Sequence, residues 1–315
     1  MSLLTMGQEH RGTISNIAEY DFTRFRTRAK PMDAPDPWIM SYIDRAGFGY
    51  VMNLVHTTID TKFILALCER WRPETHTFHL PTGECTVTLE DVYMLLGLST
   101  NEKEVFVNVQ QLNALCVEML GVDLIEGEGR ERGRGQGTGN SVNFMYLSLL
   151  EDIDEIKMYS WGFAVLDYLY NSLCKNAKND SCTFYGCAFL LQAWGWWRMP
   201  VLAPENPHIY VFPYASRFNA TGLDYTKTPV NKIIFYRKLL DRLRPQDFIW
   251  RPYLELGHES DPAEAAVWTA KSPIIRFTIM EMHQSDRVNL QFGMHQNISD
   301  PPECLEPWHL QKVSQ

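Results

Sequence analysis

The sequence lacks the short motifs by which several enzyme classes are known. It contains no HExxH, GxSxG, paired CxxC or kinase signature, and no glycine is followed by lysine, which excludes a GxxxxGK[ST] phosphate-binding loop. Its longest apolar stretch, around 185–197, is shorter than the roughly 20 residues that a membrane helix needs. No charged and then apolar leader opens the chain. We therefore expect an intracellular protein that is neither secreted nor membrane-bound.

The sequence also lacks the cysteine pattern of a disulfide-bonded protein, and it has no excess of positive charge. The seven cysteines are odd in number and scattered, which favours reduced, mostly buried thiols. The 29 Lys and Arg against 38 Asp and Glu give a net charge of −9, which argues against non-specific binding of nucleic acid by the whole chain. What is present is ordinary globular composition, with 45% hydrophobic and 21% charged residues in a chain of 315.

Composition divides the chain into three parts. Residues 1–40 are polar and predict a mobile N-terminal arm, residues 41–302 a helical domain, and residues 303–315 a C-terminal tail. Within the domain, residues 121–140 contain seven glycines and three arginines, which predicts a flexible connector.

Two arginine groups leave nucleic-acid binding open as an alternative. For each group, contact with phosphates is a weaker interpretation than the structural one, which is a mobile arm for the first group and a flexible connector for the second. The groups are Arg24, Arg26 and Arg28 in the arm, and Arg130, Arg132 and Arg134 in the connector.

Apolar residues recur at helical spacing along most of the chain, which predicts a mainly α, multi-helix globular domain. The segment 183–200 is apolar nearly all round and predicts a central buried helix. Ser285 and Gly293 predict the start and the end of a late helix. The other predicted helices are 61–71, ended by Pro73, and 89–97, 144–156, 161–174 and 231–243.

Strand signals are local. Apolar and polar residues alternate on both sides of a Pro-Thr-Gly turn, which predicts a small β-hairpin near residues 75–89. Thr88, three residues before Asp91, predicts the N-cap of the helix that follows, and Gly97 its end. Residues 272–283 predict one short extended run. Strands do not alternate with helices, so we expect no parallel sheet.

The hairpin offers a candidate metal site in His76, His79, Glu84 and Cys85. His76 and His79 are an odd number of strand positions apart, so their side chains leave opposite faces. We therefore expect each histidine to be hydrogen-bonded, and no metal.

Glu281, His283 and Asp286 form the candidate catalytic set. A carboxylate beside an imidazole can orient a general base. No nucleophile or metal motif accompanies them, which favours a helix-cap and ion-pair role. If the protein is an enzyme that uses these residues, the three side chains must converge in an open cleft. Near Trp71, we expect Arg70, Arg72 and Glu74 to fix a helix end to the hairpin through stacking and ion pairing.

Five ordered blocks between about 42 and 302 resemble the plant mobile domain family, also called the "aminotransferase-like" plant mobile domain. They include ERWRPETHTFHLPTGECTVTLEDVYMLLGL, YSWGFAVLDYLYNSLC, GCAFLLQAWGWWRMP, YRKLLDRLRPQDFIWRPY and DRVNLQFGMHQ. The signature residues, which we interpret as structural, are Arg70, Trp71, Arg72, Pro73, Glu74, His76, Phe78, Leu80, Trp161, Trp194, Trp250 and Arg287.

The resemblance implies a nuclear plant protein with protein partners. Family members occur in meristem maintenance and transposable-element silencing, and in proteins linked to mobile elements. The implied partners are related mobile-domain proteins and a long-form phosphatase of the phosphoprotein phosphatase class. Relatives carry a further apolar helical stretch between LLGL and YSWG, part of which is absent here.

The "aminotransferase-like" label does not fit the residues. Pyridoxal phosphate needs a Schiff-base lysine, a carboxylate partner and a phosphate cradle. None of Lys227, Lys232 or Lys238 has such a setting, so we expect no cofactor and no enzyme. The hypothesis is a non-catalytic nuclear interaction module. The alternative is a transposon-derived nuclease-like or nucleic-acid-binding protein.

Overall fold

The computed structural model of the chain describes thirteen stretches of residues. They are 6–13, 24–27, 35–52, 54, 58–100, 105, 146, 149–205, 211–218, 223, 232–257, 262–277 and 279–303. The predicted connector at 121–140, Arg28 and Lys227 lie outside them.

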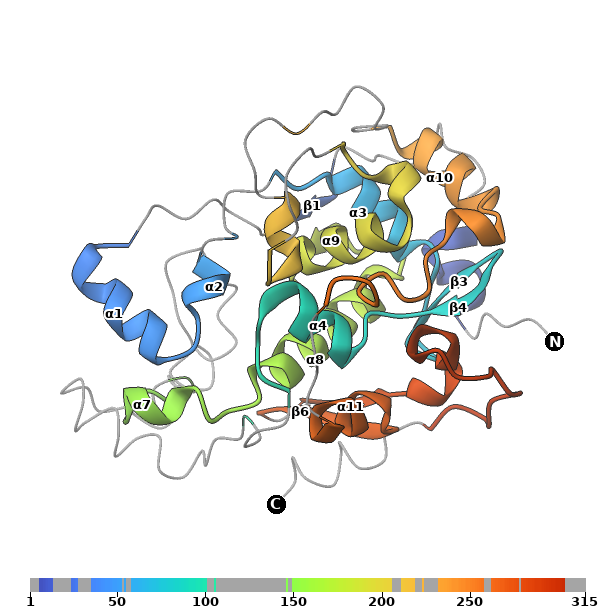
Figure 1. The fold of residues 1–315 in the computed structure, drawn as a ribbon. Coiled ribbons are helices and arrows are strands. Elements are labelled where there is room, and N and C mark those ends of the chain that lie inside the picture. Colours follow the sequence, from blue (N-terminus) through green and yellow to red (C-terminus); the bar gives the residue numbers. More distant parts are fainter. Residues whose placement is uncertain are drawn as a thin grey trace, which may run out of the picture.

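The core is made mainly by α3, α4, α8 and α9, and the other described helices lie around it. Figure 1 shows α9 and α8 crossing the middle of the molecule. None of them is long and apolar enough to cross a bilayer. Their bounds are α1 (Pro37–Arg45), α2 (Gly49–Met52), α3 (Thr61–Cys68), α4 (Leu89–Leu96), α7 (Ile153–Ile156), α8 (Trp161–Asn176), α9 (Ala188–Arg198), α10 (Ile233–Asp241) and α11 (Pro262–Thr269).

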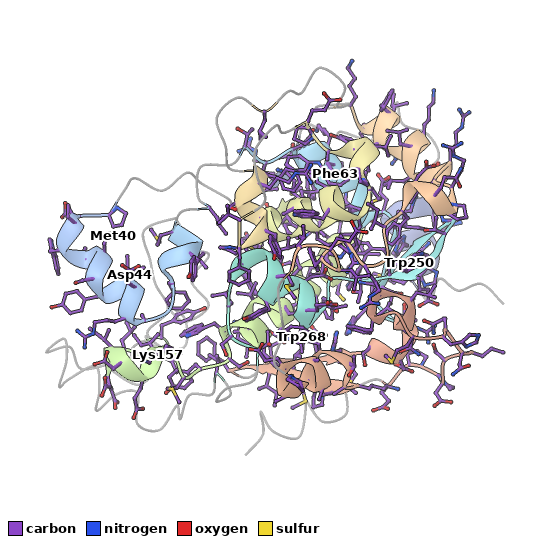
Figure 2. The ribbon with its side chains drawn as sticks, in the orientation of Figure 1. Met40, Asp44, Phe63, Lys157, Trp250 and Trp268 are labelled. Carbon is purple, nitrogen blue, oxygen red and sulfur yellow. The ribbon has the colours of Figure 1, made fainter. Side chains whose placement is uncertain are left out.

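The prediction of a central buried helix is confirmed by α9. Its side chains are buried from Leu190 to Arg198, and it packs against α3 and α4. Phe63 of α3, labelled in Figure 2, approaches α9 so closely that a Cβ on Gly195 would lie 2.6 Å from its ring. Only glycine fits at that crossing without a shift of the ring.

The prediction of a mainly α fold is wrong, because the described residues also form three small sheets, which makes the fold mixed α/β. β2, β3 and β4 form an antiparallel sheet, β6 and β7 an antiparallel hairpin, and β1 and β5 a parallel pair. The bounds are β1 (Arg26–Thr27), β2 (Trp71–Arg72), β3 (Thr77–Leu80), β4 (Gly83–Cys85), β5 (Thr183–Phe184), β6 (Ser272–Arg276) and β7 (Ile279–His283).

Strand length explains the error. The strands have two to five residues, so most are too short for an alternating pattern to be recognised. Phe277 has a φ of 55° beside the turn between β6 and β7, where the sequence offers no glycine or asparagine to signal a reversal. The predicted single run at 272–283 is therefore two strands. The predicted helix 61–71 ends at Cys68, because Trp71 pairs with Phe78 across the sheet.

The helix signals around α4 are confirmed. Thr88 and Asp91 form a reciprocal capping box, and Gly97 ends the helix with a φ of 69°. The late helix predicted from Ser285 to Gly293 is instead two 3₁₀ turns, Ser285–Arg287 and Asn289–Phe292, although Gly293 ends the second with a φ of 74°.

Described parts of the predicted N-terminal arm pack on the domain. His10 and Arg11 are fully buried, and β1 pairs with β5. The Nε2 atom of His10 lies 2.8 Å from the backbone oxygen of Trp71, and Arg11 donates to the backbone oxygen of Asn176.

At the other side of the molecule, α1, α2 and α7 form a separate group beside the core (Figure 1). Arg45 of α1 donates two hydrogen bonds to Asp154 of α7. The group joins the core where Phe48 packs edge-on against Trp161, with ring centroids 5.1 Å apart.

Candidate functional site

Trp71 is the centre of an aromatic group that joins the first sheet to α8. Its indole is fully buried, and the rings of Phe78 and Tyr170 lie with centroids 4.9 and 5.2 Å away. The indole nitrogen donates to the sulfur of Cys174 at 3.3 Å. The ring of His76 stacks over the indole at 6.0 Å with an interplanar angle of 16°. The hairpin is therefore attached to α8 through ring contacts.

His76 connects this group to β7. Its φ of 51° is left-handed, which places the imidazole opposite the second hairpin. Nδ1 lies 2.9 Å from the carbonyl oxygen of Met282, and Nε2 lies 3.3 Å from Oε2 of Glu281. Since the carbonyl only accepts, Nδ1 carries a proton, and the contact with Glu281 is an ion pair when Nε2 is protonated as well.

Around Glu281 lies a partly buried cluster of polar side chains. Asn171 of α8 donates to Oε1 of Glu281 at 3.1 Å, and one turn earlier Asp167 accepts from Nε of Arg276 at 3.1 Å. Burial raises the pKa of Asp167 to about 7, and the charge of Glu281 acts in the same direction, whereas Arg276 opposes it. We call His76, Asp167, Asn171, Arg276 and Glu281 the α8 cluster.

Sequence reasoning missed Asp167, Asn171 and Arg276. Asp167 lies four residues after Phe163 and three before Tyr170, on the apolar stripe of α8. A charged residue on the buried face of a helix needs a polar partner. The position of Asp167 on the apolar stripe could therefore have identified it as part of a buried polar cluster.

The three candidate catalytic residues do not converge. Glu281 faces α8, and Asp286 lies 3.7 Å from Nζ of Lys271. His283 is fully buried, and burial lowers its pKa to about 4, although the backbone of Ala270 acts in the opposite direction. No hydrogen bond joins any two of the three, all of which the structure describes.

His283 predicts a stability effect of pH. Its pKa is about 4 in the folded protein against 6.5 when unfolded, so the unfolded chain binds the extra proton first as pH falls. The neutral histidine's contribution is complete above pH 6.5 and is lost between pH 6.5 and 4, on the order of 3 kcal/mol in all. Chemical unfolding of both proteins across this window should show that the stability of wild type, relative to that of His283→Leu, falls by this amount as the pH is lowered from 6.5 to 4.

The difference in stability between wild type and His283→Leu measures the contribution of the histidine alone. Burial raises the pKa of Asp167 and of Glu90 to about 7, and these carboxyl groups change stability with the opposite sign over the same range. Their contribution is common to both proteins and cancels in the difference. Identical pH profiles for wild type and variant would show that His283 does not carry the effect.

The four candidate metal ligands of the hairpin do not come together as one group, although two of them, His79 and Glu84, are neighbours. Nε2 of His79 lies 3.7 Å from Oε2 of Glu84, whose carboxylate accepts two hydrogen bonds from Arg287 at 2.8 and 2.9 Å. Cys85 is fully buried, and burial raises the pKa of its thiol. His76 faces β7 instead. In the described part of the chain, no three His, Cys, Asp or Glu side chains are grouped to hold a metal.

A second polar network, which the sequence did not predict, lies under α4. Asp91 is fully buried; its Oδ1 accepts from Arg198 at 2.7 Å and from Tyr253 at 2.9 Å, and its Oδ2 accepts from the backbone nitrogen of Thr88 at 2.9 Å. Arg198 also donates to the carbonyl oxygen of Trp250 at 2.6 Å. The network joins α4, α9 and the loop after α10.

Both networks connect elements far apart in the sequence, and their acid and base groups bond to one another. Of the thiols beside them, Cys85 is buried and Cys174 is partly buried, and removal from water raises the pKa of each. A thiol with a raised pKa is a poor nucleophile. The geometry therefore supports positioning of the hairpins against α8 and α9.

The sequence profile of the plant mobile domain matches residues 47–135 and 135–311, which together span most of the chain. The chain belongs to the plant mobile domain family. The resemblance drawn from the five blocks is thereby confirmed. The two matched parts of this plant mobile domain meet at residue 135, within the glycine- and arginine-rich segment.

Several Arabidopsis thaliana proteins are similar to this plant mobile domain. Protein MAIN-LIKE 2 is 31% identical over 86% of this chain and 47% of its own length. A serine/threonine-protein phosphatase 7 long form homolog is 32% identical over 98% of this chain and 27% of its own. Protein MAINTENANCE OF MERISTEMS is 27% identical over 86% of this chain and 65% of its own. The domain is thus related to meristem maintenance proteins.

The chain spans between 27% and 65% of the length of these relatives. The alignment with the phosphatase homolog runs over 369 positions, more than the 315 residues of this chain, so that relative has residues where this chain has none. No solved structure matches the chain.

The signature arginines of the domain bind at three different places. Arg70 donates to Asp241 at the end of α10 at 2.5 Å, and Arg72 lies 3.1 Å from Nε2 of His10. The carboxylate that pairs with Arg70 is that of Asp241, and the charge of Glu74 acts on Arg72, where it opposes the lowering of the arginine's pKa by burial. The backbone oxygen of Glu74 accepts from Gln284 at 3.5 Å. Arg287 binds the hairpin through Glu84, as described above.

The signature tryptophans pack between elements. Trp161 donates to the backbone oxygen of Ile156 at 2.7 Å, and Trp194 packs on Phe78 with centroids 5.0 Å apart. Trp250, labelled in Figure 2, lies over Gly83 at the hairpin turn. The other signature positions in the hairpin region are Pro73, which is partly buried, and Leu80, which is buried.

Proposed function

We propose that this plant mobile domain is a non-catalytic, nuclear protein-interaction module that acts in meristem maintenance and transposable-element silencing. Its partners are related mobile-domain proteins and a phosphatase of the long-form phosphoprotein phosphatase class. One observation carries the proposal: the acid and base groups of the two buried networks bond to one another, whereas aromatic side chains on α1 face solvent.

The relatives support an interaction role. The phosphatase homolog carries a region similar to nearly all of this chain, and that region is 27% of its length. A domain found within a longer protein with a phosphatase name is suited to bring such an enzyme to its partners. The relatives named for meristem maintenance support the developmental setting.

The aromatic stripe on α1 has the composition of an interaction surface. Trp38 is 67% and Tyr42 is 41% exposed, and their rings meet edge-on at 6.2 Å. The guanidinium of Arg45 lies 5.7 Å from the Tyr42 ring. Trp, Tyr and Arg are enriched among residues that dominate binding energy at protein interfaces. No residue of α1 is buried, so the helix contributes little to the core.

The proposal predicts that Trp38→Ala with Tyr42→Ala reduces partner recovery at least tenfold while the fold is kept. The two rings are the exposed large hydrophobic side chains of α1, and truncating one interface hot spot costs at least about 2 kcal/mol. The measurement is affinity purification of the tagged chain from plant nuclei, with quantification of related mobile-domain proteins and of the long-form phosphatase.

The matched control is Leu254→Ala with Ile298→Ala. These side chains are 63% and 101% exposed and lie outside α1. Recovery should be unchanged in the control. Equal recovery with the α1 variant and wild type would contradict the role of α1, and absence of both partner classes from the wild-type purification would contradict the proposed function.

Two further readouts address the remaining parts of the proposal. A fluorescent fusion of the chain should accumulate in the nucleus. Purified chain should not cleave DNA or a phosphate ester. Turnover that disappears with Glu281→Gln would contradict the non-catalytic role.

A further inference from the structure

α10 lies on the side of the molecule away from α1 (Figure 1), and two of its apolar side chains are exposed to solvent. Ile234 and Phe235 are 47% and 46% exposed. The opposite face of the helix, with Ile233, Tyr236 and Leu240, is buried and packs towards α3. The inner face is therefore already used by the core, whereas the outer pair contributes little to it.

The outer pair borders an open hollow of about 400 Å³. This volume lies within the roughly 300–1,000 Å³ typical of ligand-binding pockets. The lining comprises Lys232, Ile233, Ile234, Phe235 and Lys238. A hollow with an apolar floor and two ammonium groups beside it suits a ligand that is both apolar and negatively charged.

The charge around α10 is opposite in sign to that of the whole chain. Between residues 232 and 244 there are five basic residues and one acidic residue, in a protein of net charge −9. Arg237 donates to Glu69, Arg244 to Asp247, and the one acid, Asp241, accepts from Arg70. These ion pairs neutralise two of the five basic groups and the single acid.

Three cations remain beside the apolar pair. Lys232, Lys238 and Arg242 are exposed, and none makes an ion pair within the part of the chain that the structure describes. Relative to Phe235, they lie at positions −3, +3 and +7, which places them on one helical stripe. The surface therefore combines a row of unneutralised positive charge with two large apolar side chains.

We infer that α10 binds an acidic peptide segment of a partner protein, with a large apolar side chain of the peptide in the hollow between Lys232 and Lys238. The inference rests on the proposed interaction function and adds a second surface to it. A peptide fits better than a nucleic acid, because Phe235 is the one ring of the exposed pair on which a base could stack and three cations make few phosphate contacts.

The test measures binding of a fluorescent peptide to the full chain by anisotropy at physiological salt. The probe has a Leu-Phe pair flanked on each side by three glutamates. Replacing the glutamates by glutamines, or Leu-Phe by Ala-Ala, should each weaken binding at least tenfold. Lys232→Glu with Lys238→Glu, and separately Phe235→Ser, should also weaken binding at least tenfold.

The control for the charge reversal is Lys175→Glu with Lys178→Glu. These lysines are exposed near the end of α8, and their reversal changes net charge by the same amount. The control should bind the probe as wild type does. Circular dichroism of each variant establishes that the fold is retained.

Two results would overturn the inference. One is no binding of the probe by wild type; the other is tighter, α10-dependent binding of a single-stranded RNA oligomer than of the peptide. Probe binding without partner recovery from nuclei would leave the α10 site standing and remove the proposed function. Partner recovery through α1 without probe binding would remove only the α10 site.

Discussion

Replacing Arg198 by methionine should lower the free energy of unfolding by about 3–5 kcal/mol, because it leaves a buried carboxylate without its counter-charge. Arg198 and Asp91 are fully buried and 2.7 Å apart. Loss of the guanidinium also removes the hydrogen bond to the carbonyl oxygen of Trp250. Urea unfolding followed by tryptophan fluorescence and by circular dichroism measures the change.

Two further variants test whether the loss of stability arises from the burial of the ion pair. Arg244→Met removes an arginine that is 66% exposed and paired with Asp247, so it should cost much less than Arg198→Met, because solvent screens an exposed ion pair. Arg198→Met combined with Asp91→Leu removes both charges and should be less destabilising than Arg198→Met alone. A cost for Arg198→Met no larger than that for Arg244→Met would show that the ion pair does not stabilise the junction of α4 and α9.

Trp71→Ala should also lower the free energy of unfolding by about 3–5 kcal/mol, because it leaves a large cavity among packed rings. The indole contacts Phe78, Tyr170 and His76, and it binds Cys174 of α8. Its removal takes away the ring that holds the first hairpin and β7 to the same helix. Hydrogen exchange should therefore increase first in β2, β3 and β7.

The surface tryptophan provides the matched control. Trp38→Ala truncates the same side chain at a position that is 67% exposed, so stability should stay within about 0.5 kcal/mol of wild type. Trp71→Phe should fall between wild type and Trp71→Ala, since a phenyl ring fills part of the space. Equal stability of Trp71→Ala and Trp38→Ala would contradict a central role for the indole.

These two buried centres and the two exposed helix faces divide the molecule by role. The Asp91–Arg198 network and the ring group around Trp71 join elements that are distant in the sequence. α1 and α10 present apolar and charged side chains that the core does not use. Binding in our proposals depends on these outer faces, which explains why their variants should keep the fold.

Local signals in the sequence were sufficient for several elements. The Thr88–Asp91 cap and the Gly97 terminus of α4 depend on residues within ten positions of one another. The fully apolar segment of α9 also identified a buried helix without any knowledge of its neighbours. The strands β5, β6 and β7 were missed or merged, because short strands are defined by a partner elsewhere in the chain.

The candidate site was only partly visible in the sequence. His76 and Glu281 were each selected, but in two unrelated sets, and the fold brings their side chains within 3.3 Å. Asp91 was identified as a capping residue, but its second role with Arg198 depends on α9 packing beside α4. Contacts across more than a hundred residues leave no local pattern.

The sequence by itself determined the family, the helical segments with their caps, and the absence of common catalytic motifs, because each is written in neighbouring residues. Only the tertiary structure decided that the fold is mixed α/β, which ionisable side chains are buried together, and which helix faces remain exposed. Burial and pairing depend on the distance between side chains in space, and packing sets that distance.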